Sequence, residues 1–128
     1  MYGFSVIVNM DFASAVTRVT EELQKEGFGV LTEIDIAATL KKKLNLDKRP
    51  YKILGACNPV LANQALDAEP DIGLLLPCNV VVREAANGDI VVAFMDPLAV
   101  LSLVNRDDVA QLAGQVREKL ERVKSALL

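Results

Sequence analysis

The residues best suited to chemistry are two cysteines that stand in similar phrases. Cys57 lies in Gly-Ala-Cys-Asn-Pro and Cys78 in Leu-Pro-Cys-Asn-Val, so that each is followed by an asparagine. Asn58-Pro59 is typical of a helix start, with asparagine as the N-cap and proline in the first turn. Cys57 would then lie just outside the positive end of a helix dipole, which stabilises a thiolate and lowers the pKa of a thiol. We therefore take Cys57 as the candidate nucleophile and Cys78 as its candidate partner.

Each residue of these phrases also has a structural interpretation. Free cysteines most often fill small apolar spaces in a core, and Asn58 is explained as a helix cap. Asparagine is unfavourable within a strand, so Asn79 either bonds to irregular backbone beside Pro77 or offers its amide to a ligand. Both interpretations stay open. The candidate ligand-binding residues are Cys57, Asn58, Cys78 and Asn79.

The composition excludes several kinds of chemistry. The chain has no histidine, which rules out a Cys-His or Ser-His pair and a histidine-ligated zinc ion. The redox spacing Cys-x-x-Cys is absent, and two thiolates do not complete a zinc site, which normally has four ligands. No glycine-rich nucleotide-binding loop is present. We predict no metal and no cofactor, and whether the chain is an enzyme stays open.

A cluster of basic residues between 41 and 52 is the main charged feature. It holds six of the 14 basic residues, namely Lys41, Lys42, Lys43, Lys48, Arg49 and Lys52. Such a cluster binds an anion or an acidic partner, or is simply a solvated helix face. The net charge of −3 gives no overall positive field for phosphates. We therefore expect no nucleic-acid partner.

The sequence gives no sign of a membrane or secretory address. Residues 1–5 lack the basic region of a signal peptide, and no apolar run reaches the ~20 residues of a membrane helix. We expect a soluble, cytoplasmic protein with no membrane partner.

The hydrophobic pattern predicts one domain, residues 1–128, with the order β-α-β-α-β-α-β-β-α-α. Apolar residues make up 52% of the 128 positions, enough for a core. Alternation and short apolar runs predict strands at 4–8, 28–36, 51–56, 79–85 and 90–95. Helical spacing, caps and breakers predict helices at 12–26, 37–46, 59–66, 98–104 and 107–126.

Local signals add detail to this order. Asn87-Gly88 predicts a hairpin with a type I′ turn, and Leu40 and Leu44 are expected to face inward. The antiparallel hairpin, with helices between the earlier strands, favours an α+β fold in which helices pack on a mainly antiparallel curved sheet. A small mixed or doubly wound α/β sheet is the alternative.

The two phrases resemble the signature of a known group, the domain-of-unknown-function family 302. The resemblance rests on Cys-Asn-Pro at 57–59 and Leu-Leu-Leu-Pro-Cys-Asn-Val-Val-Val at 74–82, with Tyr-Lys-Ile-Leu-Gly at 51–55 and Met-Asp-Pro at 95–97. It covers essentially the whole chain. It implies a two-layer, TATA-binding-protein-like architecture and a homodimer. It supplies no catalytic residue and no nucleic-acid binding, because architecture alone does not give function.

Three functions stay open on this basis. The first is a ligand-binding module, with an apolar pocket between sheet and helices, lined by the last helix and 98–104 and entered near Cys57 and Asn79. The second is a thiol-dependent enzyme or redox sensor with Cys57 as activated thiolate. The third is a purely structural homodimeric module. The sequence favours the first.

Overall fold

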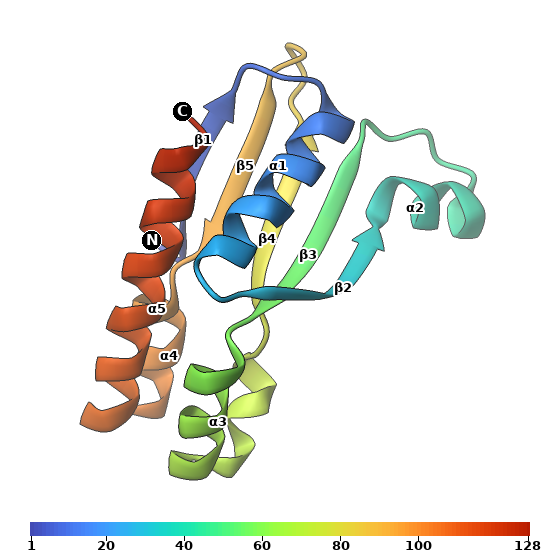
Figure 1. Cartoon of the computed structure of the whole chain (residues 1–128). Helices are drawn as coiled ribbons and strands as arrows, with labels where there is room; N and C mark the ends of the chain where they lie inside the picture. Colours follow the sequence, from blue (N-terminus) through green and yellow to red (C-terminus); the bar gives the residue numbers. More distant parts are fainter.

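The computed structural model describes all residues, 1–128, and its centre is a five-stranded sheet (Figure 1). The strands are β1 (Gly3–Val8), β2 (Gly29–Asp35), β3 (Tyr51–Cys57), β4 (Cys78–Glu84) and β5 (Ile90–Met95). They lie in the order β1-β5-β4-β3-β2, and every neighbouring pair is antiparallel. The predicted antiparallel sheet is confirmed. The doubly wound α/β alternative is wrong, because that fold needs parallel strands.

Helices form the second layer. They are α1 (Phe12–Lys25), α2 (Ile36–Leu44), α3 (Pro59–Ala68), α4 (Pro97–Leu101) and α5 (Asp107–Ala126), with 3₁₀ turns η1 (Pro70–Leu75) and η2 (Ser102–Val104). Helices α1 and α5 pack on one face of the sheet, whereas α3, η1 and α4 gather beyond the end at which β3 leaves it (Figure 1). The predicted two-layer arrangement is therefore confirmed.

The core lies between the sheet and the two covering helices. Every second residue of a strand points into the core, because successive strand side chains point to opposite faces of the sheet. These core residues include Val6, Val8, Leu54, Val80, Val82, Val92 and Phe94. Apolar residues three or four apart on α1 and α5 meet them, among them Ala15, Val19, Leu23, Val116, Leu120 and Val123. A smaller cluster continues under α3 and α4, formed by Ala65, Ile72, Leu101, Val109 and Ala113.

The β4–β5 hairpin forms as predicted, but its turn type differs. The Ala85 N–H donates to Asp89 O at 2.7 Å, and the Gly88 N–H donates to Ala85 O at 2.9 Å. Gly88 has a φ of +91°, whereas Asn87 is not among the residues of positive φ. A type I′ turn needs positive φ at both central residues. The type I′ prediction is therefore wrong, and the connection is a three-residue loop that ends in a left-handed glycine.

Three local expectations also need correction. Helix α2 projects from the β2 edge of the sheet (Figure 1) and buries no residue, and Leu44 is 63% exposed rather than inward. Residues 70–75 form η1, and β4 begins at Cys78, one residue before the predicted strand at 79–85. The predicted helix at 98–104 divides into α4, which ends at Leu101, and the turn η2, and only Leu101 of this segment is buried. No second layer covers α2 or the outer side of α4, which explains the exposed leucines.

Candidate functional site

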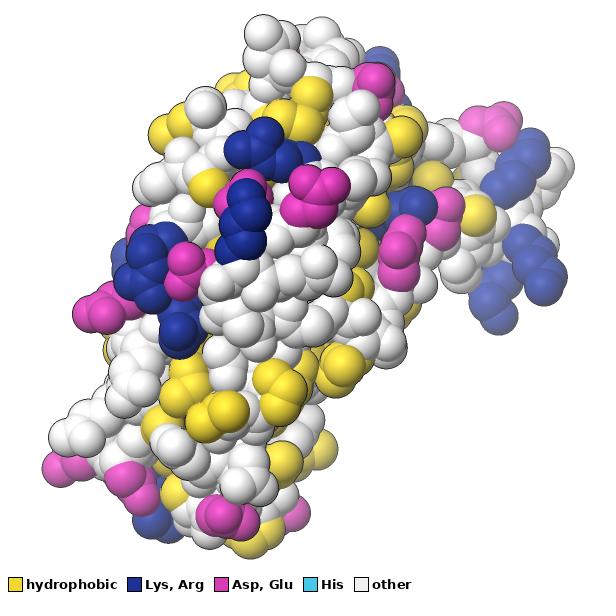
Figure 2. Space-filling view, viewed as in Figure 1, with side chains coloured by type: hydrophobic (Ala, Val, Ile, Leu, Met, Phe, Trp, Pro, Cys, Tyr) yellow, Lys and Arg dark blue, Asp and Glu magenta, His cyan; other side chains and the backbone are white.

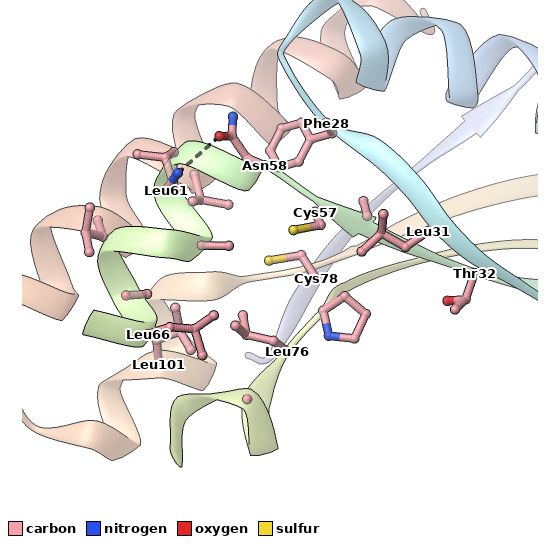
Figure 3. A pocket seen from close by; sticks show the side chains of 17 residues that line it. Phe28, Leu31, Thr32, Cys57, Asn58, Leu61, Leu66, Leu76, Cys78 and Leu101 are labelled. Atoms are coloured by element: carbon pink, nitrogen blue, oxygen red, sulfur yellow. Dashed lines mark hydrogen bonds between the residues drawn. The ribbon is translucent and has the colours of Figure 1, made fainter. Parts of the chain in front are cut away.

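A cavity of about 380 Å³ opens where β3 and β4 run into the helical end of the molecule. Figure 3 shows it between the sheet, α3 and η1, with α5 behind. Seventeen residues line it and 13 of them are hydrophobic: Phe28, Leu31, Thr32, Ala56, Cys57, Asn58, Leu61, Ala62, Ala65, Leu66, Gly73, Leu76, Pro77, Cys78, Leu101, Leu112 and Val116. No lining side chain carries a fixed charge. The volume lies within the ~300–1,000 Å³ of small-molecule sites.

The ends of β3 and β4 form one wall of this cavity, and the segment between them in sequence, which contains α3 and η1, forms the other. Cys57 is the last residue of β3 and Cys78 the first of β4, so the chain from 57 to 78 leaves the sheet and returns to it beside the same opening. Leu101 of α4 and Leu112 of α5 close the far side. The last helix and the segment 98–104, which were expected to line a pocket, contribute Leu112, Val116 and Leu101 to this lining.

Both cysteines lie in the wall of the cavity. Cys57 is half-buried and Cys78 is buried, and neither is in a disulfide. In Figure 3 the two sulfur atoms are neighbours and point toward α3. Burial, with a smaller contribution from the nearby Cys57, raises the pKa of Cys78 from its ordinary 9.0 to about 11. Cys78 is therefore a neutral thiol at physiological pH.

The side-chain amide of Asn58 already forms hydrogen bonds within the protein. Its Oδ1 accepts a hydrogen bond from the Leu61 N–H at 3.3 Å and so caps α3, and Pro59 follows in the first turn. Its Nδ2 donates to Glu26 O at 3.5 Å, which ties the start of α3 to the end of α1. Gly27 ends α1 with a φ of +86°, and a Cβ there would lie 3.1 Å from the same amide nitrogen. The predicted cap is thus confirmed.

Asn79 lies apart from the other three candidates. It is exposed and lines a separate hollow of about 600 Å³ with residues of β1 and β5, including Ser5 and Ala93. Its strand neighbour Cys78 lines the first cavity. Consecutive strand residues point to opposite faces, so the expectation of one site holding all four residues is wrong for Asn79. The structure brings together Cys57, Asn58 and Cys78.

Gly55 supports the cavity from behind two of its lining residues, although it does not line the cavity itself. It pairs with Thr32 of β2 on one side and with Asn79 of β4 on the other. A Cβ on Gly55 would overlap the Thr32 hydroxyl and lie 3.0 Å from Pro77 Cγ. The missing side chain therefore lets Thr32 and Pro77, both lining residues, close over β3. The only signal was a glycine inside a strand, which often marks a close approach.

The rim of the cavity is made of exposed leucines. Leu31 sits at a β-bulge of β2 and is 66% exposed, and Leu66 of α3 is 42% exposed. Leu66 lies at the opening of the cavity rather than in the core. Figure 2 shows hydrophobic side chains gathered across the lower part of this face, over the region of α3. An exposed apolar rim around an apolar cavity is typical of a binding site.

The predicted basic cluster lies elsewhere. The residues from 41 to 49 are exposed on and after α2, on the arm that projects at the right of Figure 2, and none of them lines the cavity. Lys41 forms an ion pair with Asp47 at 2.9 Å, and Lys52 forms one with Glu33 at 2.6 Å.

The two cysteines have no neighbouring side chain that could join them as a third ligand of a metal ion, because no group of three Cys, Asp or Glu side chains comes together.

Comparison with known proteins places the chain in a family. Residues 4–127 match the domain of unknown function DUF302. The chain belongs to the DUF302 family. The crystal structure of an uncharacterized conserved DUF302 protein from Bacillus stearothermophilus has a TM-score of 0.93 and 28% sequence identity, with 100% of this chain and 99% of that chain covered. A search of the curated proteins found no match.

The predicted membership of this family is therefore confirmed, and so is the predicted fold. None of the helices of this DUF302 chain is long and apolar enough to cross a membrane.

Proposed function

We propose that this DUF302 chain is a binding module for a small, uncharged and mainly apolar molecule, which occupies the cavity between β3, α3 and η1. The observation that carries the proposal is the lining, which holds 13 hydrophobic residues and no charged one. A charged ligand would lose its hydration there without gaining a partner. An apolar ligand would gain by removing its own surface and that of the rim leucines from water.

The polar groups of the lining limit the ligand further. Asn58 already caps α3, so its amide has little capacity left. The groups that remain are the Thr32 hydroxyl and the two thiols. A few polar groups in an apolar cavity fix the orientation of a ligand. We therefore propose an apolar body with at most one weakly polar end directed to Cys57 and Thr32.

The alternative is a thiol-dependent enzyme with Cys57 as activated nucleophile. A thiol nucleophile is commonly activated by an adjacent base or cation. The chain has no histidine, and no Asp, Glu, Lys or Arg lines the cavity. The lining thus favours binding over catalysis.

We also propose a homodimer and a cytoplasmic location. The sheet face opposite α1 and α5, here called the open face, carries Ile7, Ile34, Ile53, Val81 and Ala93, and Ile7 is 61% exposed. A second copy of this chain is the proposed partner of that face, in agreement with the homodimer that the family resemblance implies. Free cysteines suit a reducing compartment, which supports the location.

A matched pair of fluorescent probes tests the binding proposal. N-phenyl-1-naphthylamine is uncharged, whereas 1-anilinonaphthalene-8-sulfonate has the same rings and a negative charge. We expect saturable fluorescence enhancement with the uncharged probe and binding at least tenfold weaker for the sulfonate, because the lining offers the anion no cation. Equal affinity for the two probes, or no saturation with either, would contradict the proposal.

Two substitutions locate the probe. Ala62 lines the cavity, so Ala62→Phe fills it, whereas Ala110 is exposed on α5, away from the cavity. We expect Ala62→Phe to weaken binding of the uncharged probe at least tenfold and Ala110→Phe to leave it unchanged. Circular dichroism and the unfolding midpoint check that both variants fold. Equal binding by both variants would place the probe outside the cavity.

A further inference from the structure

Cys57 and Cys78 mark the two points at which the cavity wall is joined to the sheet. The intervening chain holds all of α3 and η1 and returns to the sheet in the neighbouring strand. Ala56 pairs directly with Cys78 across β3 and β4, so Cys57 is one residue beyond this pair. The two cysteines therefore lie at the base of the wall, on adjacent strands.

Their separation fits a covalent bond. Strands lie ~4.8 Å apart and rise ~3.3 Å per residue, so the two Cα atoms on this diagonal are about 6 Å apart. That lies within the range of about 4.4–6.8 Å found for disulfides. Regular pleating would direct Cys57 and Cys78 to opposite faces. Cys57, however, ends its strand where the chain turns into α3, and both side chains line the same cavity.

The two thiols differ in access. Cys57 is half-buried beside the opening, whereas Cys78 is 7% exposed. A reagent that enters the cavity meets Cys57 first, and Cys78 is then the nearest thiol to the product. This is the arrangement of an attacking and a resolving cysteine, although the chain lacks the Cys-x-x-Cys spacing.

We propose that Cys57 and Cys78 form a reversible dithiol–disulfide site, oxidised by small organic disulfides that enter the cavity, and that the disulfide fixes the α3–η1 wall to the sheet. The site stands whether or not the cavity binds an apolar ligand, because it depends only on the two sulfur atoms and on access to Cys57.

The exchange balances in two steps. The Cys57 thiolate attacks one sulfur of the external disulfide, a bond forms between them, and the released thiolate takes up the proton that Cys57 lost. The Cys78 sulfur then attacks Cys57 in this mixed disulfide, loses its own proton, and expels the second external thiol. Overall the protein dithiol is oxidised to a disulfide and the external disulfide is reduced to two thiols. An external dithiol reverses both steps.

The second step should be slow at neutral pH. A pKa of about 11 leaves little Cys78 as thiolate, and the rate of exchange depends on the thiolate fraction. Closure of the disulfide should therefore speed up about tenfold for each pH unit between 7 and 10. A mixed disulfide on Cys57 that has been formed and separated from excess reagent should therefore last much longer at pH 7 than at pH 10.

Intact-mass spectrometry with hydroxyethyl disulfide, a small uncharged reagent, tests the site on the reduced full chain. We expect the wild type to lose two hydrogen atoms, a peptide map to show Cys57 joined to Cys78, and dithiothreitol to restore the dithiol. Cys78→Ala should keep a stable mixed disulfide on Cys57. Cys57→Ala should stay unmodified while folded, because Cys78 is buried.

Several results would overturn the proposal. These are a mixed disulfide that persists on Cys57 of the wild type at every pH, a disulfide between two chains, or no reaction before the protein unfolds. The wild type alone decides these outcomes, so they do not depend on the folding of a variant. Probe binding to the reduced protein is measured separately, so a failure of the redox site is distinguishable from a failure of ligand binding.

Discussion

At the scale of single residues, the buried thiol of Cys78 has a consequence for stability. Its pKa in the folded protein is about 11, against an ordinary 9.0, and burial is the main cause. Below pH 9 the thiol is neutral in both the folded and the unfolded chain. Above that, only the unfolded chain loses its proton, which stabilises the unfolded state. The protein should lose stability as pH rises from about 9 to about 11.

Urea unfolding at a series of pH values measures this loss. A pKa change from 9.0 to about 11 corresponds to a decrease of about 3 kcal/mol in the free energy of unfolding. Tyrosines and lysines titrate in the same range, so the quantity compared is the pH dependence of the wild type against that of Cys78→Ala. We expect the variant to lack the extra decrease. Cys57→Ala should keep most of it, because burial outweighs the charge of Cys57. Parallel curves for wild type and Cys78→Ala would contradict this account.

The residue scale also shows what the sequence could and could not reveal. The Asn58 cap and the glycine end of α1 were predictable because both depend on local backbone chemistry. Asn79 could have been separated from Cys78 by strand alternation alone. Cys57 could not have been placed by the same rule, because its side-chain direction depends on where β3 ends.

At the scale of elements, the close packing of side chains from β2 and from just before the start of β4 over β3 depends on Gly55. Thr32 and Pro77 occupy the space that a side chain would take. We expect Gly55→Ala to lower the free energy of unfolding by about 1–3 kcal/mol, because overpacking forces the strands or these two side chains to shift. Chemical denaturation measures the change.

Gly29→Ala is the matched control for this prediction. Gly29 also lies in a strand, but a Cβ there would meet no atom within 4 Å. We expect its effect to be small or slightly stabilising, since alanine restricts the unfolded chain. Thr32→Ala combined with Gly55→Ala should recover part of the loss. Equal effects of the two glycine substitutions would show that close approach at Gly55 is not the cause.

The elements themselves were largely predictable, whereas the cavity was not. Periodicity and the Pro and Gly signals located every strand and most helix ends, because these signals act over a few residues. The cavity joins Leu31, Leu66 and Leu112, which lie far apart in the sequence. Their meeting depends on the strand order β1-β5-β4-β3-β2, which no local signal contains. The early alternation of strands and helices even suggested parallel pairing.

At the scale of the whole molecule, the two faces of the sheet differ in cover. Helices α1 and α5 bury one face, while α2 projects beyond the β2 edge of the sheet (Figure 1). Ile7 near one side of the open face and Ile34 near the other are both exposed. An uncovered apolar sheet face is a common site of association, and a two-fold pair would cover both copies with the same surface.

Sedimentation velocity tests the proposed homodimer and its face. We expect the wild type at micromolar concentration to sediment with twice the chain mass of 13.9 kDa. Ile34→Glu and Ile7→Glu should each shift it to a monomer, because an unpaired carboxylate buried between two sheets is costly. Leu103→Glu is the control, since Leu103 is 76% exposed on η2, and it should leave the dimer intact. A monomeric wild type would exclude the dimer. Dissociation by Leu103→Glu alone would move the interface to the helical end of the molecule.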